Sequence, residues 1–315
     1  MANLEHLAWL QQGVVRWNEW RTQQTQVVLD LSGADLSGMQ LEGVDLSDVN
    51  LSRSALYQTN LTNANLTRSR LNDASLAGAK LVNARLSQAE LVNATLIAAN
   101  LNGAILNDAI LIGADLKIAS LQQADLSRTN LSATELRGAN LRGADLDKAD
   151  LSRANLSEAM LIGANLGMAN LSRANLYQAE LSQAQLYRAN LEQANLMEVH
   201  FGAAYLFGAN LAQANSLGAD FSWSNLNHTN FTDAKMQVAN LRGATCRRAN
   251  FSRTNLSRAN LRGVDLGQSV LAGAILTEAD LSEIDLSQVD LREAVRGEAI
   301  EERDVNFTTV ESGFR

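Results

Sequence analysis

The residues of this chain that could do chemistry are few and scattered. Cys246 is the only cysteine, which excludes an internal disulfide and a cysteine-based metal cluster. The three histidines, His6, His200 and His228, lie far apart in the sequence, and the aspartates are spread evenly instead of clustering. No phosphate-binding loop, Ser-His-Asp arrangement or metal-ligand spacing occurs. The sequence therefore predicts a protein that is not an enzyme and that has no metal site and no cofactor.

A five-residue repeat accounts for most of the chain. From Leu31 to Leu291 a central residue, nearly always Leu, returns every five positions. A small residue, usually Ala, stands two positions before it, and Asp or Asn most often stands directly before it, as in residues 154–158 (ANLSE). This period fits neither an α-helix nor a flat strand. It fits a short strand, with Ala and Leu pointing to one side, followed by a corner.

A chain that turns the same way after every unit must coil around its Ala and Leu side chains, and periodicity alone permits three or four units per turn. The unit resembles the motif of the pentapeptide repeat family, Ala-(Asp/Asn)-Leu-x-x, over residues 31–295. This resemblance implies an all-β fold, a right-handed quadrilateral parallel β-helix, or solenoid, of about thirteen coils. Residues twenty positions apart in the sequence would then stack.

The rarer central residues support a turn of twenty residues. In that register Phe201 stacks on Phe221, and Phe231 stacks on Phe251 on the opposite wall. A slimmer central residue in the same coils would compensate for each larger ring, because packing density stays constant. The central residues that would do so are Ser216, Met236 and Cys246.

The composition agrees with a filled aliphatic solenoid. Apolar residues make up 46% of the chain and aromatic residues only 5%, so Leu and Ala must build the core. Proline is absent, as expected where each unit donates backbone N–H groups to a neighbouring coil. The formal charge of −8 disfavours direct nucleic-acid binding. Since no secretion signal or membrane-spanning stretch is evident, we expect a cytoplasmic protein without membrane contact.

Both ends of such a coil expose an open strand edge that needs cover. We expect residues 1–29 to provide an N-terminal capping helix, over residues 3–22, and a lead-in to the repeat domain, residues 30–295. A partner-binding helix is the alternative. The C-terminal tail, residues 296–315, either folds back over the last coil or is a disordered end. The apolar face of the capping helix comprises Leu4, Leu7, Leu10, Val14 and Trp17, flanked by Trp9 and Trp20.

The N-terminal segment carries a resemblance of its own. Gly13, residues 17–21 (WNEWR) and residues 30–34 (DLSGA) together resemble a leader that precedes pentapeptide repeats in cyanobacterial proteins. This resemblance implies a regulatory protein, since some relatives of that kind act in heterocyst differentiation and patterning.

With the core filled, function is expected on the outer surface. Tyr177, Met197 and Leu217 occupy the same outward position on successive coils and would form an exposed apolar column. Aromatic residues, which are favoured in interfaces, cluster on the opposite wall and at the edge between the two walls. The candidate protein-binding residues are Tyr177, Tyr187, Met197, Tyr205, Phe207, Leu217 and Trp223.

Two other groups depart from a polar surface. A β-branched patch on two adjoining walls is explained equally well by strand propensity and by a dimer or partner contact. An arginine collar surrounds the coil and is expected to be solvated, with recognition of an acidic partner as the alternative. The patch comprises Val92, Ile97, Ile110, Ile112 and Ile118, and the collar comprises Arg242, Arg247, Arg248, Arg253, Arg258 and Arg262.

The sequence thus favours a non-catalytic scaffold that binds another protein, a regulator, with a homo-oligomer compatible with the same surface. The alternative is a DNA mimic that binds DNA gyrase, as some members of the resembling family do. The net charge of −8 is small for a mimic, and the arginine collar interrupts its negative surface. The repeat itself does not encode the partner or the pathway.

Overall fold

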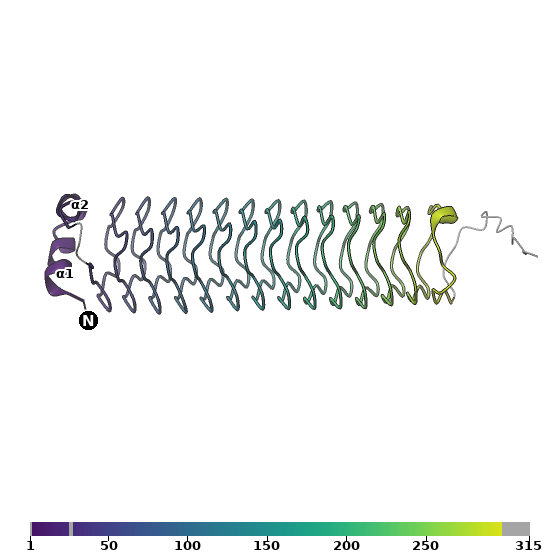
Figure 1. The fold of residues 1–315 in the computed structure, drawn as a ribbon. Helices are drawn as coiled ribbons and strands as arrows, with labels where there is room; N and C mark the ends of the chain where they lie inside the picture. The colour runs from purple at the N-terminus through teal and green to yellow at the C-terminus, as the bar shows by residue number, and fades with distance from the viewer. Residues whose placement is uncertain (1, 25–27, 298–315) are drawn as a thin grey trace, which may run out of the picture.

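The structure is a rod of stacked coils with two short helices at one end (Figure 1). It is a computed structural model and describes residues 2–24 and 28–297. Parallel bridges join residues directly before the repeat centres to those twenty positions further on, from Asp30 with Asn50 to Ile275 with Val295. Four five-residue units therefore complete one turn, which confirms the register of twenty residues.

Each coil has four walls, and we name these after the central residues of one coil. Wall A contains Leu191, wall B Leu196, wall C Phe201 and wall D Leu206, so that A lies opposite C and B lies opposite D. These central residues are fully buried, as are nearly all the others and the small residues two positions before them. The core is thus a continuous stack of Leu and Ala along the rod.

The phenylalanine stacks lie where the register predicts them. The rings of Phe201 and Phe221 stack on wall C with centroids 5.1 Å apart, and those of Phe231 and Phe251 stack on wall A at 5.0 Å. Phe221 and Phe231 also meet edge to face across the core at 5.9 Å. Ser216 is fully buried in the same coil as these two rings, and its small side chain leaves them room.

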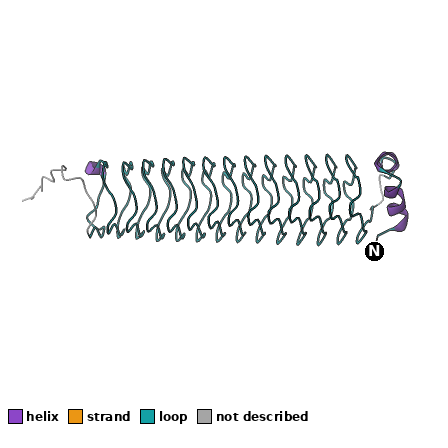
Figure 2. Ribbon diagram, turned by 180° about the vertical axis from the view of Figure 1, so that it is seen from behind, coloured by secondary structure: helices purple, strands orange, loops and turns teal. Residues whose placement is uncertain are grey.

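The walls are built from isolated bridges and turns, and the described residues form no extended strand (Figure 2). In the first unit, Leu31 N–H donates to the carbonyl of Asn50 in the next coil (2.8 Å), and Ala34 N–H donates back to the carbonyl of Leu31 (3.0 Å). The short strand predicted for each unit is therefore a single bridged residue. The other residues of the unit make the turn.

Every turn requires a left-handed residue. The second residue after each centre, from Gly33 to Glu283, has a positive φ close to +60°. Gly and Asn adopt this conformation readily, whereas β-branched and bulky residues rarely do. The chain nevertheless places Ile118, Trp223 and Val238 at this position, and all three side chains are largely exposed.

Outward asparagines connect successive coils by amide ladders. On wall A, Asn170 donates to the carboxylate of Asp150 (2.9 Å) and Asn190 donates to Asn170 (3.3 Å). On wall B, Asn155 donates in the same direction to Glu135 (2.9 Å). A carboxylate suits the N-terminal end of these ladders because it accepts hydrogen bonds and has none to donate.

The N-terminal cap consists of two helices, so the prediction of one helix over residues 3–22 was wrong. Helix α1 spans Leu4–Gln11 and helix α2 spans Val14–Arg21. Gly13 separates them with φ 101° and ψ 162°, a conformation that no helix contains.

The break redistributes the predicted apolar face. Leu10 and Trp17 are fully buried, and Leu7 and Val14 are partly buried against the core. Leu4 is 80% exposed, contrary to the prediction that it faces the first coil. Within α1 the buried side chains are His6 and Leu10, four positions apart, and Leu4 lies on another side of the same helix.

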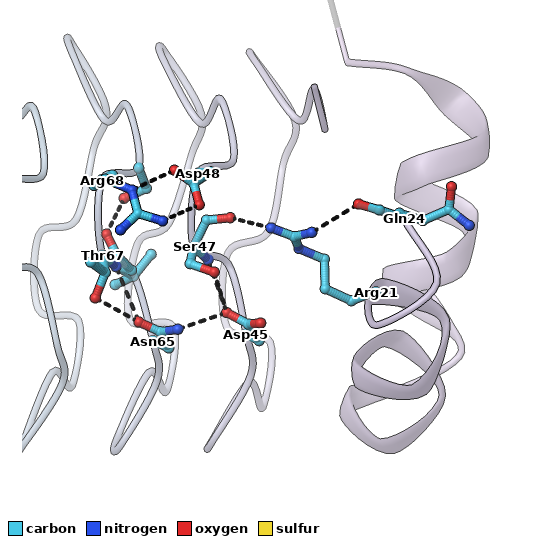
Figure 3. Close-up of polar contacts among 10 residues, drawn as sticks. Arg21, Gln24, Asp45, Ser47, Asp48, Asn65, Thr67 and Arg68 are labelled. Carbon is cyan, nitrogen blue, oxygen red and sulfur yellow. Dashed lines mark hydrogen bonds and ion pairs between the residues drawn. The ribbon is translucent and has the colours of Figure 1, made fainter. Parts of the chain in front are cut away.

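Polar groups of α2 bond to the open edge of the first coil on wall D. Trp17 Nε1 donates to the carbonyl of Asp45 (2.7 Å), while Asn18 accepts from Asp45 N–H (2.9 Å) and donates to the carbonyl of Gly43 (3.1 Å). Arg21 donates to the carbonyl of Ser47 (2.8 Å), as Figure 3 shows. Backbone groups that an earlier coil would have satisfied are thus satisfied by the helix.

Wall A of the first coil is covered in the same way by the other helix. Asn3, the N-cap of α1, donates its N–H to the carbonyl of Asp30 (3.0 Å), and His6 Nδ1 accepts from Asp30 N–H (3.0 Å). At the far end of the rod the regular turns give way to a 3₁₀-helix, η1, at Leu286–Gln288. The predicted alternatives for the tail rest on residues 298–315, which lie outside the described residues.

We expect Asn18→Ala to weaken the cap locally. Asp45 N–H would lose its acceptor, and its hydrogen-exchange protection should fall by about tenfold, which corresponds to one lost hydrogen bond. Exchange measured over residues 43–47 tests this, with Glu19→Ala, an exposed neighbour on α2, as the control. Unchanged protection in the Asn18 variant would show that the helix does not close this edge.

Ile118→Asn should stabilise the protein by about 1 kcal/mol, because Asn tolerates the left-handed turn better than a β-branched residue. Ile112→Asn is the matched control, since Ile112 is also an outward isoleucine but is not in the left-handed region. The measurement is a comparison of the thermal stability of the two variants with that of the wild type. Equal or lower stability of Ile118→Asn relative to Ile112→Asn would argue against strain in the turn.

Candidate protein-binding surface

The side chains that could take part in chemistry make contacts within the protein. The thiol of Cys246 is fully buried, and burial raises its pKa far above the usual value. His6 bonds to the first coil, His200 lies 3.6 Å from a Glu180 oxygen, and His228 packs against the ring of Phe207. Within residues 2–24 and 28–297 no group of three or more His, Cys, Asp or Glu side chains is arranged to hold a metal ion.

The structure brings together three of the predicted residues on wall D. The ring of Phe207 stacks on those of Tyr187 and Tyr205, with centroids 6.1 Å and 6.2 Å away. All three side chains are partly exposed. The register explains the cluster. Tyr187 and Phe207 are twenty residues apart and therefore stack, and Tyr205 precedes the wall D centre that Phe207 follows.

Two polar side chains extend this aromatic cluster along the corner between walls D and A. The guanidinium carbon of Arg188 lies 5.2 Å from the ring centre of Tyr187. His228, one coil beyond Phe207, lies with its ring centre 5.0 Å from that of Phe207. Neither Arg188 nor His228 was among the residues predicted from the sequence. The register could have indicated both, because Arg188 directly follows Tyr187 and His228 lies one coil and one position beyond Phe207.

The other predicted column lies on wall B. Tyr177 and Met197 are partly exposed and Leu217 is 37% exposed. They occupy equivalent positions on successive coils, as the bridges between Asn175 and Asn195 and onward to Asn215 establish. Wall B faces away from wall D, so this column and the aromatic cluster are two separate surfaces.

Trp223 lies at the corner between walls C and D, and its side chain is 67% exposed. Its ring packs over Gly243, the equivalent corner of the next coil, where an added Cβ would come within 2.4 Å of the indole. A glycine at this position is what allows the indole to lie flat along the corner. The described residues give Trp223 no ring contact with the wall D cluster.

The β-branched patch lies on walls A and B, as predicted. Ile110 and Ile112 on wall A are each 38% exposed, and Ile118 at the corner beyond wall B is 64% exposed. Val92 and Ile97 are partly exposed nearby. Strand propensity explains the first two isoleucines, but it does not explain Ile118, which is in the left-handed region.

Most of the arginine collar is paired with carboxylates on the neighbouring coil. Arg253 forms a two-pronged contact with Asp233 (2.7 and 2.8 Å), and Arg258 does so with Glu278 (2.7 and 3.3 Å). These hydrogen bonds from arginine hold the pKa values of the Asp233 and Glu278 carboxyls below their usual range. Half-exposed pairs of this kind contribute little stability, but they neutralise the surface locally.

The fold and its repeating unit define the class of protein: a solenoid of stacked five-residue units. The family model for pentapeptide repeats matches eight copies between residues 30 and 293, nearly all of the repeat region. The chain therefore belongs to the pentapeptide repeat family, which folds as right-handed quadrilateral β-helices. No curated protein gives a significant match. Among the described residues, neither helix is long and apolar enough to cross a bilayer.

Several solved structures are similar to this chain. One is HetL, a pentapeptide repeat protein involved in heterocyst differentiation regulation in the cyanobacterium Nostoc sp. strain PCC 7120; it is 29% identical, with 90% of this chain and 96% of HetL covered and a TM-score of 0.35. QnrB1, a plasmid-mediated fluoroquinolone resistance protein, is 19% identical over 61% of this chain and 84% of its own, with a TM-score of 0.30. Rfr23 from the cyanobacterium Cyanothece 51142 is 31% identical over 35% of this chain and 58% of its own, with a TM-score of 0.18.

Gly243→Ala should destabilise the protein more than Gly163→Ala. Both glycines have nearly the same φ (+66° and +65°), but only at Gly243 would the new methyl group meet the Trp223 ring. The difference should be about 1–2 kcal/mol in thermal or urea unfolding, the cost of forcing an extra methyl group into a filled space. In a Trp223→Ala background the two glycine variants should become equal. A persisting difference would mean that the indole does not rest on this corner.

Proposed function

We propose that this protein is a non-catalytic scaffold that binds another protein through the aromatic cluster of wall D. The observation that carries the proposal is the stack of Tyr187, Tyr205 and Phe207, which is partly exposed on a surface otherwise dominated by polar ladders and ion pairs. Tyrosine and other aromatic residues supply large contact areas at little entropic cost, and they dominate binding energy at interfaces.

The rest of the fold supports this reading. Because each coil is tied to the next by backbone hydrogen bonds, the aromatic rings are held at fixed spacing before a partner arrives. The column of Tyr177, Met197 and Leu217 on wall B is a second candidate surface, for another partner or for a second copy of the chain. We place the protein in the cytoplasm as part of this proposal, and the leader resemblance favours a regulator of heterocyst differentiation as its partner.

The ion pairs weigh against the alternative, a DNA mimic that binds gyrase. A mimic needs a continuous negative surface along the rod. Here several carboxylates are bridged to an arginine one coil away, as in the pairs of Asp48 with Arg68 (2.7 Å) and Asp108 with Arg128 (2.7 Å). Such pairs interrupt the negative potential at intervals along the surface.

The test is affinity capture from the native organism with matched surface variants. Tyr187→Ser/Phe207→Ser should lose a partner that the wild type retains, with at least about a tenfold drop in recovery, since each change removes an aromatic anchor. Tyr177→Ser/Leu217→Ser should retain that partner. Thermal melts establish that both variants are folded. Equal capture by the wild type and the wall D variant would remove this surface as the interface.

A further inference from the structure

The stretch of wall D that carries the aromatic cluster is also free of carboxylates. Five successive coils place there, and at its corner with wall A, three arginines, one histidine and no Asp or Glu, in a chain whose net charge is −8. The segments concerned are residues 165–168, 185–188, 205–208, 225–228 and 245–248.

The partners of the arginines here differ from those of Arg253 and Arg258 on walls A and B. Arg188 packs on the ring of Tyr187, and Arg248 donates to the neutral amide oxygen of Gln268 (2.8 Å). Arg247, at the C-terminal limit of the stretch, contacts Asp265 through one guanidinium nitrogen at 3.3 Å. Arg253 and Arg258, by contrast, each donate to a carboxylate through two guanidinium nitrogens.

We infer that this stretch binds a short acidic segment of a partner protein that also carries an aliphatic or aromatic side chain. The inference rests on the proposed function and names the chemistry of its partner. We call the surface the aromatic–basic strip, and its residues are Tyr187, Arg188, Tyr205, Phe207, His228, Arg247 and Arg248. Charge complementarity carries the choice: the guanidinium groups of Arg188 and Arg248 have no carboxylate partner among the described contacts, so they are available to carboxylates from outside.

The dimensions of the strip set the length of the bound segment. Neighbouring coils are separated by about 4.8 Å, and the residues of the strip lie on four coils, so the strip extends over roughly 14 Å. An extended polypeptide covers this distance with about four residues. One apolar side chain would pack on the exposed parts of the Tyr187, Tyr205 and Phe207 rings, while carboxylates before and after it would meet Arg188 and Arg248.

The probe is a displayed library of random twelve-residue peptides, selected on the full-length protein at physiological salt. We expect the enriched peptides to combine Asp or Glu with an aromatic or aliphatic residue. Affinities of the enriched peptides are then measured for Arg188→Gln/Arg248→Gln and for Arg253→Gln/Arg258→Gln. The two double variants remove equal charge from nearby coils, but only the first removes it from the strip.

The strip variant should bind the enriched peptides about tenfold more weakly, and the control variant should stay within about threefold of the wild type. Equal losses in both variants, enrichment of basic or neutral peptides, or no enrichment would overturn the inference. Phe207→Ser separates these failures from failure of the proposed function. Neutral peptides whose binding still depends on Phe207 would preserve the aromatic interface and reject only its acidic partner.

Discussion

The hydrogen bonds between backbones of neighbouring coils are the constraint on which the structure depends. From Leu31 to Leu261 each centre donates its N–H to a carbonyl nineteen residues further on, as Leu156 does to Asn175 at 2.7 Å. This bond fixes the register, and the register assigns every residue to a wall and a height. A five-residue unit can meet this demand only if the chain bends after each bridge, which is why a left-handed residue recurs at every turn.

Once the register is fixed, the surface of this fold consists of columns of side chains that run along the rod. Side chains twenty residues apart lie side by side, so an interacting surface can be written in the sequence as one position repeated over several coils. The same geometry gives rise to asparagine ladders and to arginine–carboxylate pairs between coils. Both satisfy or neutralise polar groups on the surface of the rod.

The sequence could predict what the repeat determines. The burial of Leu156, the stacking of Phe201 on Phe221 and the inward position of Cys246 all follow from period and register. It could not place the first helices, because the conformation of Gly13 ends α1 and no repeat fixes how α2 then packs. The sequence also could not predict which residue each arginine contacts. The side chain of Arg253 turns back to Asp233, while that of Arg248 turns forward to Gln268, although both belong to the predicted arginine collar.

The turn residues show where the surface departs from what the fold itself prefers. Any residue with a favourable left-handed conformation suits the second position after a centre, and Gly, Asn or Asp would suit it at the lowest cost. Trp223 and Ile118 occupy it at an energetic cost of the order of 1–3 kcal/mol each, and they bury little area in return. Trp223 moreover depends on Gly243 for the space that its indole fills. The core and the ladder between coils do not require these two side chains, which therefore mark two places where the surface departs from the preference of the turn.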